Sequence, residues 1–549
     1  MFRIQRLSPI AAAICAFLIP LRAQDAQPTA PLVLRSTTRL VQVSVIVDDG
    51  KGQPVADLKK EDFQIKVGGK VQPISVFSMD AGTPSASSPA LAHNDQPLPP
   101  NVYTNRLERN GNAGSGITII LLDERNTRLT DLIQAKAQVV RYLRTLQPGD
   151  HIGLYVLAGS LRVLHDYTAD SATLLNRLES YKQGQALPNT TTGESKDAME
   201  GDALILDGWV RASGGSPLER AFYTTDRIFA TLRAFEFIAD HMAHTAGRKN
   251  LVWVSGGFPL EIGYDSVAAW HNPAIEQRTF TEEVSHTIRA LNDANIAVYP
   301  VDARGLMVDP RFNAERRSAP RNRPLTAPVG VKNQQTMEEL ASRTGGRAHY
   351  NTNDLAKAIK AAVDDSRVTY TLGFYPTEEK FDGKFHEIKV QVVERGGVKL
   401  RYRKGYFDLP EAPQDDATRK RELADAVWSP IDATALGLLA QVQPGSKRGT
   451  VDIAVKIDHT GVSLQSQQDR WVGRLDVLFV QKDDRGNQYN GRSDTIELRL
   501  TPETYQKLMK EDLVYHQVVD RAAGAKALRI VVRDAASGSI GSVTAPLPR

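Results

Sequence analysis

Four continuous apolar runs, separated by helical patterns, constrain the fold of this 549-residue chain more than any other feature. The runs are ITIILLD (117–123), HIGLYVLAG (151–159), KNLVWVSGG (249–257) and IAVYPVDARG (296–305). A strand that is apolar on both faces is typical of a parallel sheet with helices on either side. Helical spacing recurs between the runs, so the pattern predicts an α/β fold built on a doubly wound, mostly parallel, Rossmann-like sheet.

Alternation of apolar and polar residues on both sides of this region predicts strands with one buried face. Neither flanking β segment has enough strands to close a core alone, so we expect the two to pack together as a sandwich-like module. The chain divides into a signal peptide (1–23), an N-terminal β segment (24–80), a linker (81–115), the α/β domain (116–366), a second β segment (367–408), another linker (409–428) and a C-terminal antiparallel β domain (429–549).

The first residues have the order of a secretory signal. Arg3 and Arg6 precede a short apolar run over 10–21, and Ala23 offers a small residue for cleavage. Removing this segment, which also contains Arg22, leaves 65 basic and 64 acidic residues and lowers the formal charge from +4 to +1. We therefore expect a secreted, periplasmic or cell-envelope protein with no membrane span after cleavage and no basic surface for nucleic acid.

Cysteine and histidine usage limits the chemistry. The single cysteine, Cys15, lies in the predicted signal, which excludes disulfides, cysteine nucleophiles and cysteine-bound zinc from the processed chain. His241 and His244 lie one helical turn apart without a third ligand nearby in the sequence, so we interpret them as a pair on a helix surface. No acid–base pair, nucleophile–base pair or cofactor motif assembles in the sequence, which favours a protein that is not an enzyme.

Five segments together resemble a known family. They are DDGKGQPVADLKKEDFQIKVGGKVQPI, ITIILLDERNT, GRKNLVWVSGGFPL, IAVYPVDARGL and LASRTGGRAHYNTNDLAKAI. In this order the chain resembles, over residues 35–408, the von Willebrand factor type A-related family found mainly in Acidobacteria. The resemblance implies a doubly wound sheet with a metal-ion-dependent adhesion site at the carboxyl end of its first strand.

In that family site an Asp-x-Ser-x-Ser motif, a threonine from a second loop and an aspartate from a later strand bind magnesium, which prefers oxygen ligands. Asp123 matches the first acid and Thr127 the second hydroxyl. Arg125 replaces the first hydroxyl and cannot be a ligand. Asn126 offers a carbonyl oxygen beside it.

The remaining family ligands are changed as well. Gly256 occupies the position of the second aspartate, which leaves Ser255 as the nearest oxygen, and the loop threonine corresponds to Ser216 or to Thr231. The candidate metal ligands, and so the candidate Mg²⁺ site, are Asp123, Asn126, Thr127, Ser255 and Thr231. The alternative is a degenerate site in which Asp123 caps the neighbouring helix or pairs with Arg125.

These features favour an exported, von Willebrand A-type binding or adhesion protein that acts on a protein partner. Two alternatives stay open. One is a metal-assisted hydrolase that uses the strand-end carboxylates Asp123, Glu124 and Asp302, although Asp302 should lie two strands away from Asp123. The other is a structural envelope protein that binds no metal.

Overall fold

The computed structural model describes residues 40–80, 98–106, 116–147, 150–181, 217–245, 247–259, 261–262, 278–306, 329–376, 384–393, 395–407, 416–467, 469–484 and 486–548. The signal peptide predicted at 1–23 lies outside the described residues, and so does Ser216.

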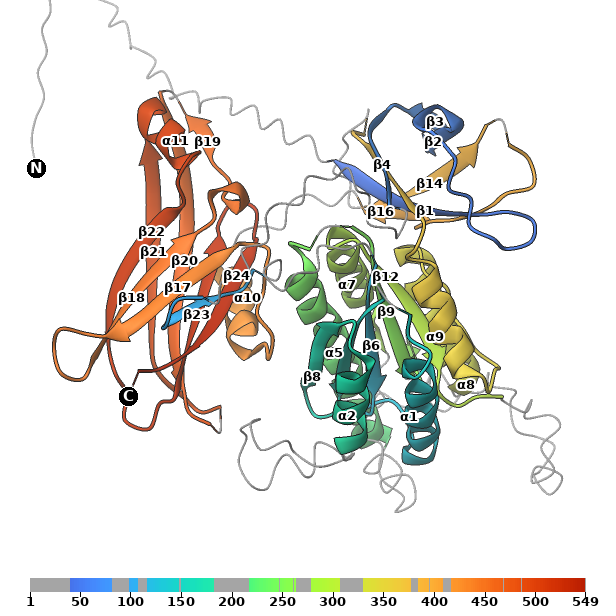
Figure 1. Cartoon of the computed structure of the whole chain (residues 1–549), viewed down its shortest axis with the longest axis horizontal. Helices are drawn as coiled ribbons and strands as arrows, with labels where there is room; N and C mark the ends of the chain where they lie inside the picture. Colours follow the sequence, from blue (N-terminus) through green and yellow to red (C-terminus); the bar gives the residue numbers. More distant parts are fainter. Residues whose placement is uncertain are drawn as a thin grey trace, which may run out of the picture. The chain divides into compact units, whose positions relative to one another are not determined.

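A five-stranded sheet forms the centre of the α/β part (Figure 1). Its order is β12-β9-β6-β7-β8, with β6 in the middle. All neighbours are parallel except β8, which runs antiparallel to β7 at one edge. The α/β class predicted from the sequence is therefore confirmed. The bounds are β6 (Ile117–Asp123), β7 (His151–Leu157), β8 (Leu161–Thr168), β9 (Lys249–Ser255) and β12 (Ile296–Asp302).

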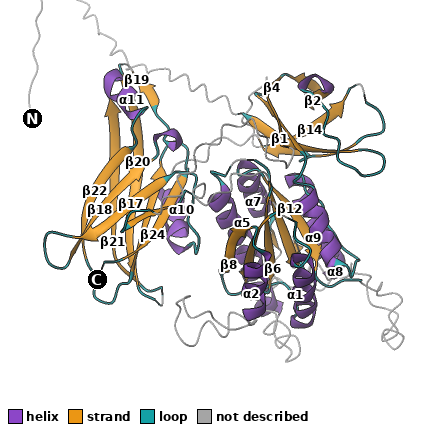
Figure 2. Ribbon diagram, in the orientation of Figure 1, coloured by secondary structure: helices purple, strands orange, loops and turns teal. Residues whose placement is uncertain are grey.

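Helices cover both faces of this sheet (Figure 2). Alternate residues of β6 supply the two cores, because Ile120 packs into one cluster and Leu121 into the other. The first core includes side chains of α1 (Leu129–Leu143), α2 (Ser171–Ser180) and α9 (Leu355–Asp364). The second includes side chains of α5 (Pro217–Met242), α7 (Thr281–Asp293) and α8 (Val329–Thr344). A two-stranded ribbon joins β10 (Glu261–Ile262) to β11 (Arg278–Thr279).

Strands from both ends of the α/β part form two four-stranded sheets, β15-β1-β13-β4 and β16-β14-β2-β3. Val43 pairs with Leu372 in the first and Ile65 with Val390 in the second, and all four side chains belong to one apolar core. The strands are β1 (Val41–Asp48), β2 (Phe63–Val67), β3 (Lys70–Gln72), β4 (Ile74–Asp80), β13 (Thr369–Phe374), β14 (Phe385–Val392), β15 (Lys399–Arg401) and β16 (Gly405–Phe407).

The C-terminal part contains two antiparallel sheets around one apolar core. One sheet has the order β22-β18-β17-β5, and the other β19-β20-β23-β24 with β21 also paired to β20. The bounds are β5 (Val102–Thr104), β17 (Leu438–Pro444), β18 (Thr450–Ile457), β19 (Gln465–Gln467), β20 (Arg470–Lys482), β21 (Gln488–Leu500), α11 (Pro502–Leu508), β22 (Leu513–Asp520), β23 (Ala527–Asp534) and β24 (Ile540–Pro546).

Two segments interpreted as linkers contain regular structure. Within 81–115, β5 adds an edge strand to β17, and the Asn105 side chain donates to the carbonyl groups of Ala433 and Leu436. Within 409–428 the chain forms α10 (Asp416–Trp428). Three strand residues are too few to show a period, and α10 buries few of its side chains, so neither element left a clear apolar pattern.

Across the described residues, no helix combines the length and apolar character needed to cross a bilayer.

Candidate functional site

The candidate site centres on Asp123, the last residue of the central strand β6. Its side chain is completely buried. The neighbouring strand β9 runs parallel in register, with Leu122 beside Val254, so Ser255 ends next to Asp123. The carboxyl ends of parallel strands are where doubly wound sheets place their ligand sites.

Four hydrogen bonds occupy the Asp123 carboxylate. The Asn126 backbone N–H donates to Oδ1 at 3.0 Å. The Asn126 amide at 2.8 Å, the Trp253 indole at 2.9 Å and the Ser255 hydroxyl at 2.7 Å all donate to Oδ2. The carboxylate therefore has neutral donors on both oxygens.

The two other predicted residues join the same network. The Asn126 amide nitrogen lies 2.7 Å from Thr231 Oγ1, and Thr231 in turn donates to the Arg227 carbonyl within α5. Thr127 Oγ1 accepts the backbone N–H of Gly256 at 3.0 Å. The structure thus brings together all five residues that the sequence singled out, from β6, the turn after it, α5 and β9.

The electrostatics of Asp123 follow from this enclosure. Burial raises the pKa of its carboxyl group, and the hydrogen bonds from Asn126, Ser255 and Trp253 only partly offset that rise. A buried carboxylate is usually paired with a cation. Here the donors are neutral, so Asp123 has hydrogen bonds from them but no compensating positive charge.

This arrangement does not fit a magnesium ion. Asn126 turns its amide nitrogen, not its carbonyl oxygen, towards Asp123, and a nitrogen that donates cannot be a ligand. Gly256 leaves no room for the missing second aspartate, because a Cβ there would fall inside the contact distance of the Asn126 carbonyl oxygen. The backbone of the turn after β6 thus fills the space that a side chain at position 256 would occupy.

Arg125 is turned away from Asp123. Its guanidinium pairs with Asp226 on α5 and donates to the Gly159 carbonyl at 3.0 Å. The interpretation that Asp123 pairs with Arg125 is therefore wrong, because Arg125 pairs with Asp226 and donates to carbonyl groups of the turn after β7. Asp123 caps the turn at Asn126, whereas α1 begins later, at Leu129.

The strand-end carboxylates of the hydrolase alternative do not converge. Asp302 ends β12, two strands from β6, and forms an ion pair with Arg304 at 2.7 Å. Glu124 interacts with Tyr181 and Lys136. Each of these carboxylates thus has its own partner, and among the described residues the three acids do not form one cluster of potential metal ligands.

His241 is buried, so the prediction of a helix-surface pair is wrong for this residue. Its Nδ1 lies 2.6 Å from the Asp432 carbonyl oxygen and its Nε2 lies 3.2 Å from an Asp166 carboxylate oxygen. Both partners only accept hydrogen bonds, so both ring nitrogens must carry protons. Burial opposes this charge, but Asp166 and Asp432 outweigh burial and raise the pKa of His241.

One group of potential metal ligands in the described C-terminal part, Asp458, His459 and Asp512, lies close together. Arg106 pairs with Asp458, and Lys456 Nζ lies 3.2 Å from Asp512. These cations already neutralise the two carboxylates, so the group is an ion-pair cluster in this structure.

Sequence reasoning missed Trp253 and Asp226. Trp253 lies in the middle of an apolar run and is a core residue, as its position suggests. Its indole N–H also donates to Asp123. Asp226 lies 101 positions from Arg125. No local spacing could link them.

Exposed apolar side chains occur on the connections at the carboxyl ends of the parallel strands. Leu129 and Ile133 lie at the start of α1, Phe222 lies one turn before Asp226 on α5, and Leu306 follows β12; we call these four residues the apolar rim. Their exposed fractions are between 53% and 68%. Large apolar side chains that gather at one edge often mark an interaction surface.

Comparisons with known proteins give limited information. No family model matches the chain, and no curated protein matches it. Solved structures with similarity include an aerotolerance-related membrane protein from Bacteroides fragilis (14% identity, 45% of this chain and 98% of that chain, TM-score 0.25). Others are the N-terminal domains of the type V pili tip protein Mfa5 from Porphyromonas gingivalis (9%, 87% and 78%, 0.26) and a von Willebrand factor type A protein from Catenulispora acidiphila (9%, 88% and 75%, 0.21). These TM-scores are too low to support any conclusion, so the description of the fold rests on the strand order of this chain.

Proposed function

We propose that the chain is an exported, von Willebrand A-type adhesion protein that binds another protein at the carboxyl edge of its parallel sheet without a metal ion. Its main support is the apolar rim, which lies on the connections around Asp123. The rim residues Leu129, Phe222 and Leu306 belong to three separate connections, each of which begins or runs at the carboxyl ends of the parallel strands. A protein partner could bury them together.

The saturated hydrogen bonding of Asp123 supports binding without metal. In the family site a metal ion completes its shell with a carboxylate of the partner. Here the carboxylate already accepts four hydrogen bonds, and Arg125 is committed to Asp226. The polar network then acts as a rigid base, and the apolar rim supplies the contact.

The test is co-purification from the envelope of the producing cells with the tagged chain, its Phe222→Asp variant and a control variant. Val514→Asp is a suitable control, since Val514 is 50% exposed on β22 of the C-terminal sheet. We expect one protein to be retained by the wild type and by Val514→Asp, with or without EDTA, and lost by Phe222→Asp. Loss of that protein in EDTA, or its retention by Phe222→Asp, would contradict the proposal.

A further inference from the structure

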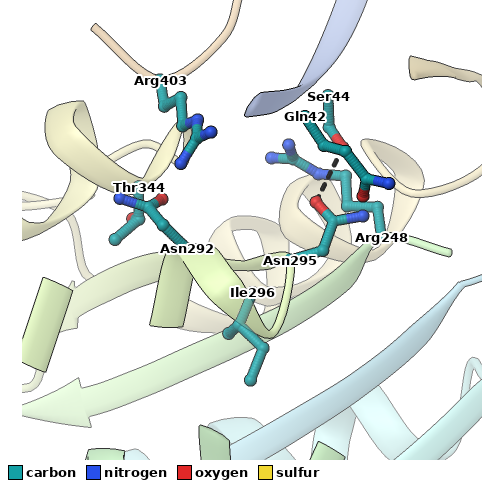
Figure 3. A pocket seen from close by; sticks show the side chains of 8 residues that line it. All are labelled: Gln42, Ser44, Arg248, Asn292, Asn295, Ile296, Thr344 and Arg403. Atoms are coloured by element: carbon teal, nitrogen blue, oxygen red, sulfur yellow. Dashed lines mark hydrogen bonds between the residues drawn. The ribbon is translucent and has the colours of Figure 1, made fainter. Parts of the chain in front are cut away.

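A polar pocket lies far from Asp123, between strand β1 and the ends of helices α7 and α8 (Figure 3). The pocket opens to solvent, and its enclosed space is only about 10 Å³, so a bound group would lie largely at its open side. Two of its lining residues are arginines and none is acidic; the set is Gln42, Ser44, Arg248, Asn292, Asn295, Ile296, Thr344 and Arg403.

Arg248 is the buried charge of this pocket, with only 4% of the residue exposed. Its Nη2 donates to the Tyr299 hydroxyl at 3.0 Å and to the Gly345 carbonyl at 2.7 Å, both of which are neutral. Its Nε has no hydrogen-bond acceptor among the residues that the structure describes. A guanidinium removed from water normally takes a carboxylate or another anion as its partner.

The carboxylate that Arg248 reaches through Tyr299 is already neutralised. Tyr299 passes its own hydrogen bond to Asp365 at 3.0 Å, and Asp365 forms an ion pair with Arg401. Arg401 also binds Asp48 at 2.7 Å. Among the described residues, the contacts of Arg248 thus lead to a negative charge through a tyrosine hydroxyl and not directly.

A second guanidinium faces the same space. Figure 3 shows Arg403 and Arg248 extending into the pocket from opposite sides. The backbone at Arg403 is fixed against the end of α8, because a Cβ at Gly345 would lie 2.8 Å from the Arg403 nitrogen and Lys404 donates to the Ser342 carbonyl. Arg248 and the backbone that carries Arg403 are thus held by two separate segments of the chain.

Amide groups complete the lining. The Ser44 hydroxyl donates to Asn295 Oδ1 at 2.8 Å, which leaves the NH₂ of Asn295 as its other polar group (Figure 3). Gln42 adds a second amide on the exposed side. Guanidinium and amide N–H groups arranged around one space form the donor set that binds an oxyanion with several oxygens.

We propose that this pocket binds an inorganic oxyanion of the phosphate or sulfate type, held between Arg248 and Arg403. The anion would join β1 and the loop after β15 to the ends of α7 and α8, so that binding stabilises the contact between these parts. This site is independent of the apolar rim and of the function proposed for it.

The test is isothermal titration of the whole chain with inorganic phosphate, in chloride buffer of constant ionic strength. We expect saturable binding of one phosphate per chain. Arg403→Gln should weaken the affinity about tenfold or more, because it removes a charge-assisted hydrogen bond. Arg499→Gln is the matched control, since Arg499 is an exposed arginine on β21, and it should bind as the wild type does.

Sulfate and acetate arms identify the anion. Saturable binding of sulfate together with weak binding of acetate would support a multiply charged oxyanion, whereas acetate binding as tight as phosphate would overturn this assignment. Absence of saturable phosphate binding, or equal binding by Arg403→Gln, would overturn the site. Arg403→Gln is preferred to a change at Arg248, because loss of the bond to Gly345 could unfold the end of α8.

Discussion

Replacing Asp123 by alanine should destabilise the α/β part strongly, because this side chain is the shared acceptor of a buried network. The Trp253 indole and the Asn126 backbone N–H would lose the acceptor they have in the structure. The Asn126 amide keeps Thr231, and the Ser255 hydroxyl can turn. At about 1–3 kcal/mol for each buried donor left without a partner, two donors cost about 2–6 kcal/mol.

Part of this loss is offset, because the variant no longer buries a carboxylate, and burial of that group is unfavourable, as the raised pKa of Asp123 indicates. We therefore expect a loss of about 3 kcal/mol in the free energy of unfolding. For a domain of this size such a loss lowers the melting temperature by about 6–12 °C. Ser255→Ala is the graded control, because it keeps the Asp123 carboxylate and removes only the Ser255 hydroxyl, which donates to Asp123 and accepts the Gly257 N–H, and it should cost about 1–3 kcal/mol.

Differential scanning calorimetry in EDTA and in millimolar Mg²⁺ measures both the stability and the metal response. A metal that binds the native state at a hundred times its Kd would add about 2.7 kcal/mol. We expect the wild type to melt at the same temperature in both buffers. Wild-type stabilisation by Mg²⁺ that Asp123→Ala abolishes would refute the hydrogen-bonded account, and an unchanged melting temperature for Asp123→Ala would refute the structural role.

Four further outcomes follow from the structure. Gly256→Ala should lower stability by about 1–3 kcal/mol, since its Cβ meets the Asn126 carbonyl oxygen, and a wild-type melting temperature would show that the turn can move. The pKa of His241 is higher in the folded than in the unfolded chain, so protonated His241 stabilises the fold fully below the unfolded pKa and this stabilisation is lost as the pH rises through the folded pKa. The difference in free energy of unfolding between wild type and His241→Gln, measured by chemical denaturation, should therefore shrink from pH 6 to pH 9. N-terminal sequencing of the exported chain should begin after Ala23, and a retained first residue would contradict the signal prediction. Residues 24–80 alone should give no cooperative melt by circular dichroism, because the strands over 41–80 share their core with strands beyond residue 368.

The class of the α/β sheet was predictable because its signal is local. Each buried strand is a run of apolar residues that can be recognised without knowing which strands lie beside it. The ends of two such runs place Asp123 and Ser255 at strand ends. Parallel pairing then brings the two ends together. The cluster around Asp123 was therefore accessible from the order of the strands and the resemblance.

The chemistry inside the cluster was not predictable in the same way. Its details depend on groups about a hundred or more positions away in the sequence. Thr231 orients the Asn126 amide, Asp226 pairs with Arg125, and the Asp432 carbonyl binds the buried His241. The residue types allowed both a metal site and a hydrogen-bonded one. Only the packing of Asn126 against Gly256 distinguishes between them.

If the edge binds a partner without metal, as we propose, the contact must be of a different kind from that in the family site. In the proposed metal-free site a partner carboxylate would meet no cation, so the contact would come from the rim side chains and from polar groups on the partner. The exposed parts of Leu129, Ile133, Phe222 and Leu306 would each contribute about 1–1.5 kcal/mol on burial, or about 4–6 kcal/mol together. Association costs about 4–15 kcal/mol before any net affinity appears. The rim can therefore fix where a partner binds, but tight attachment requires further polar contacts or several copies acting together, and either should leave the affinity insensitive to chelators.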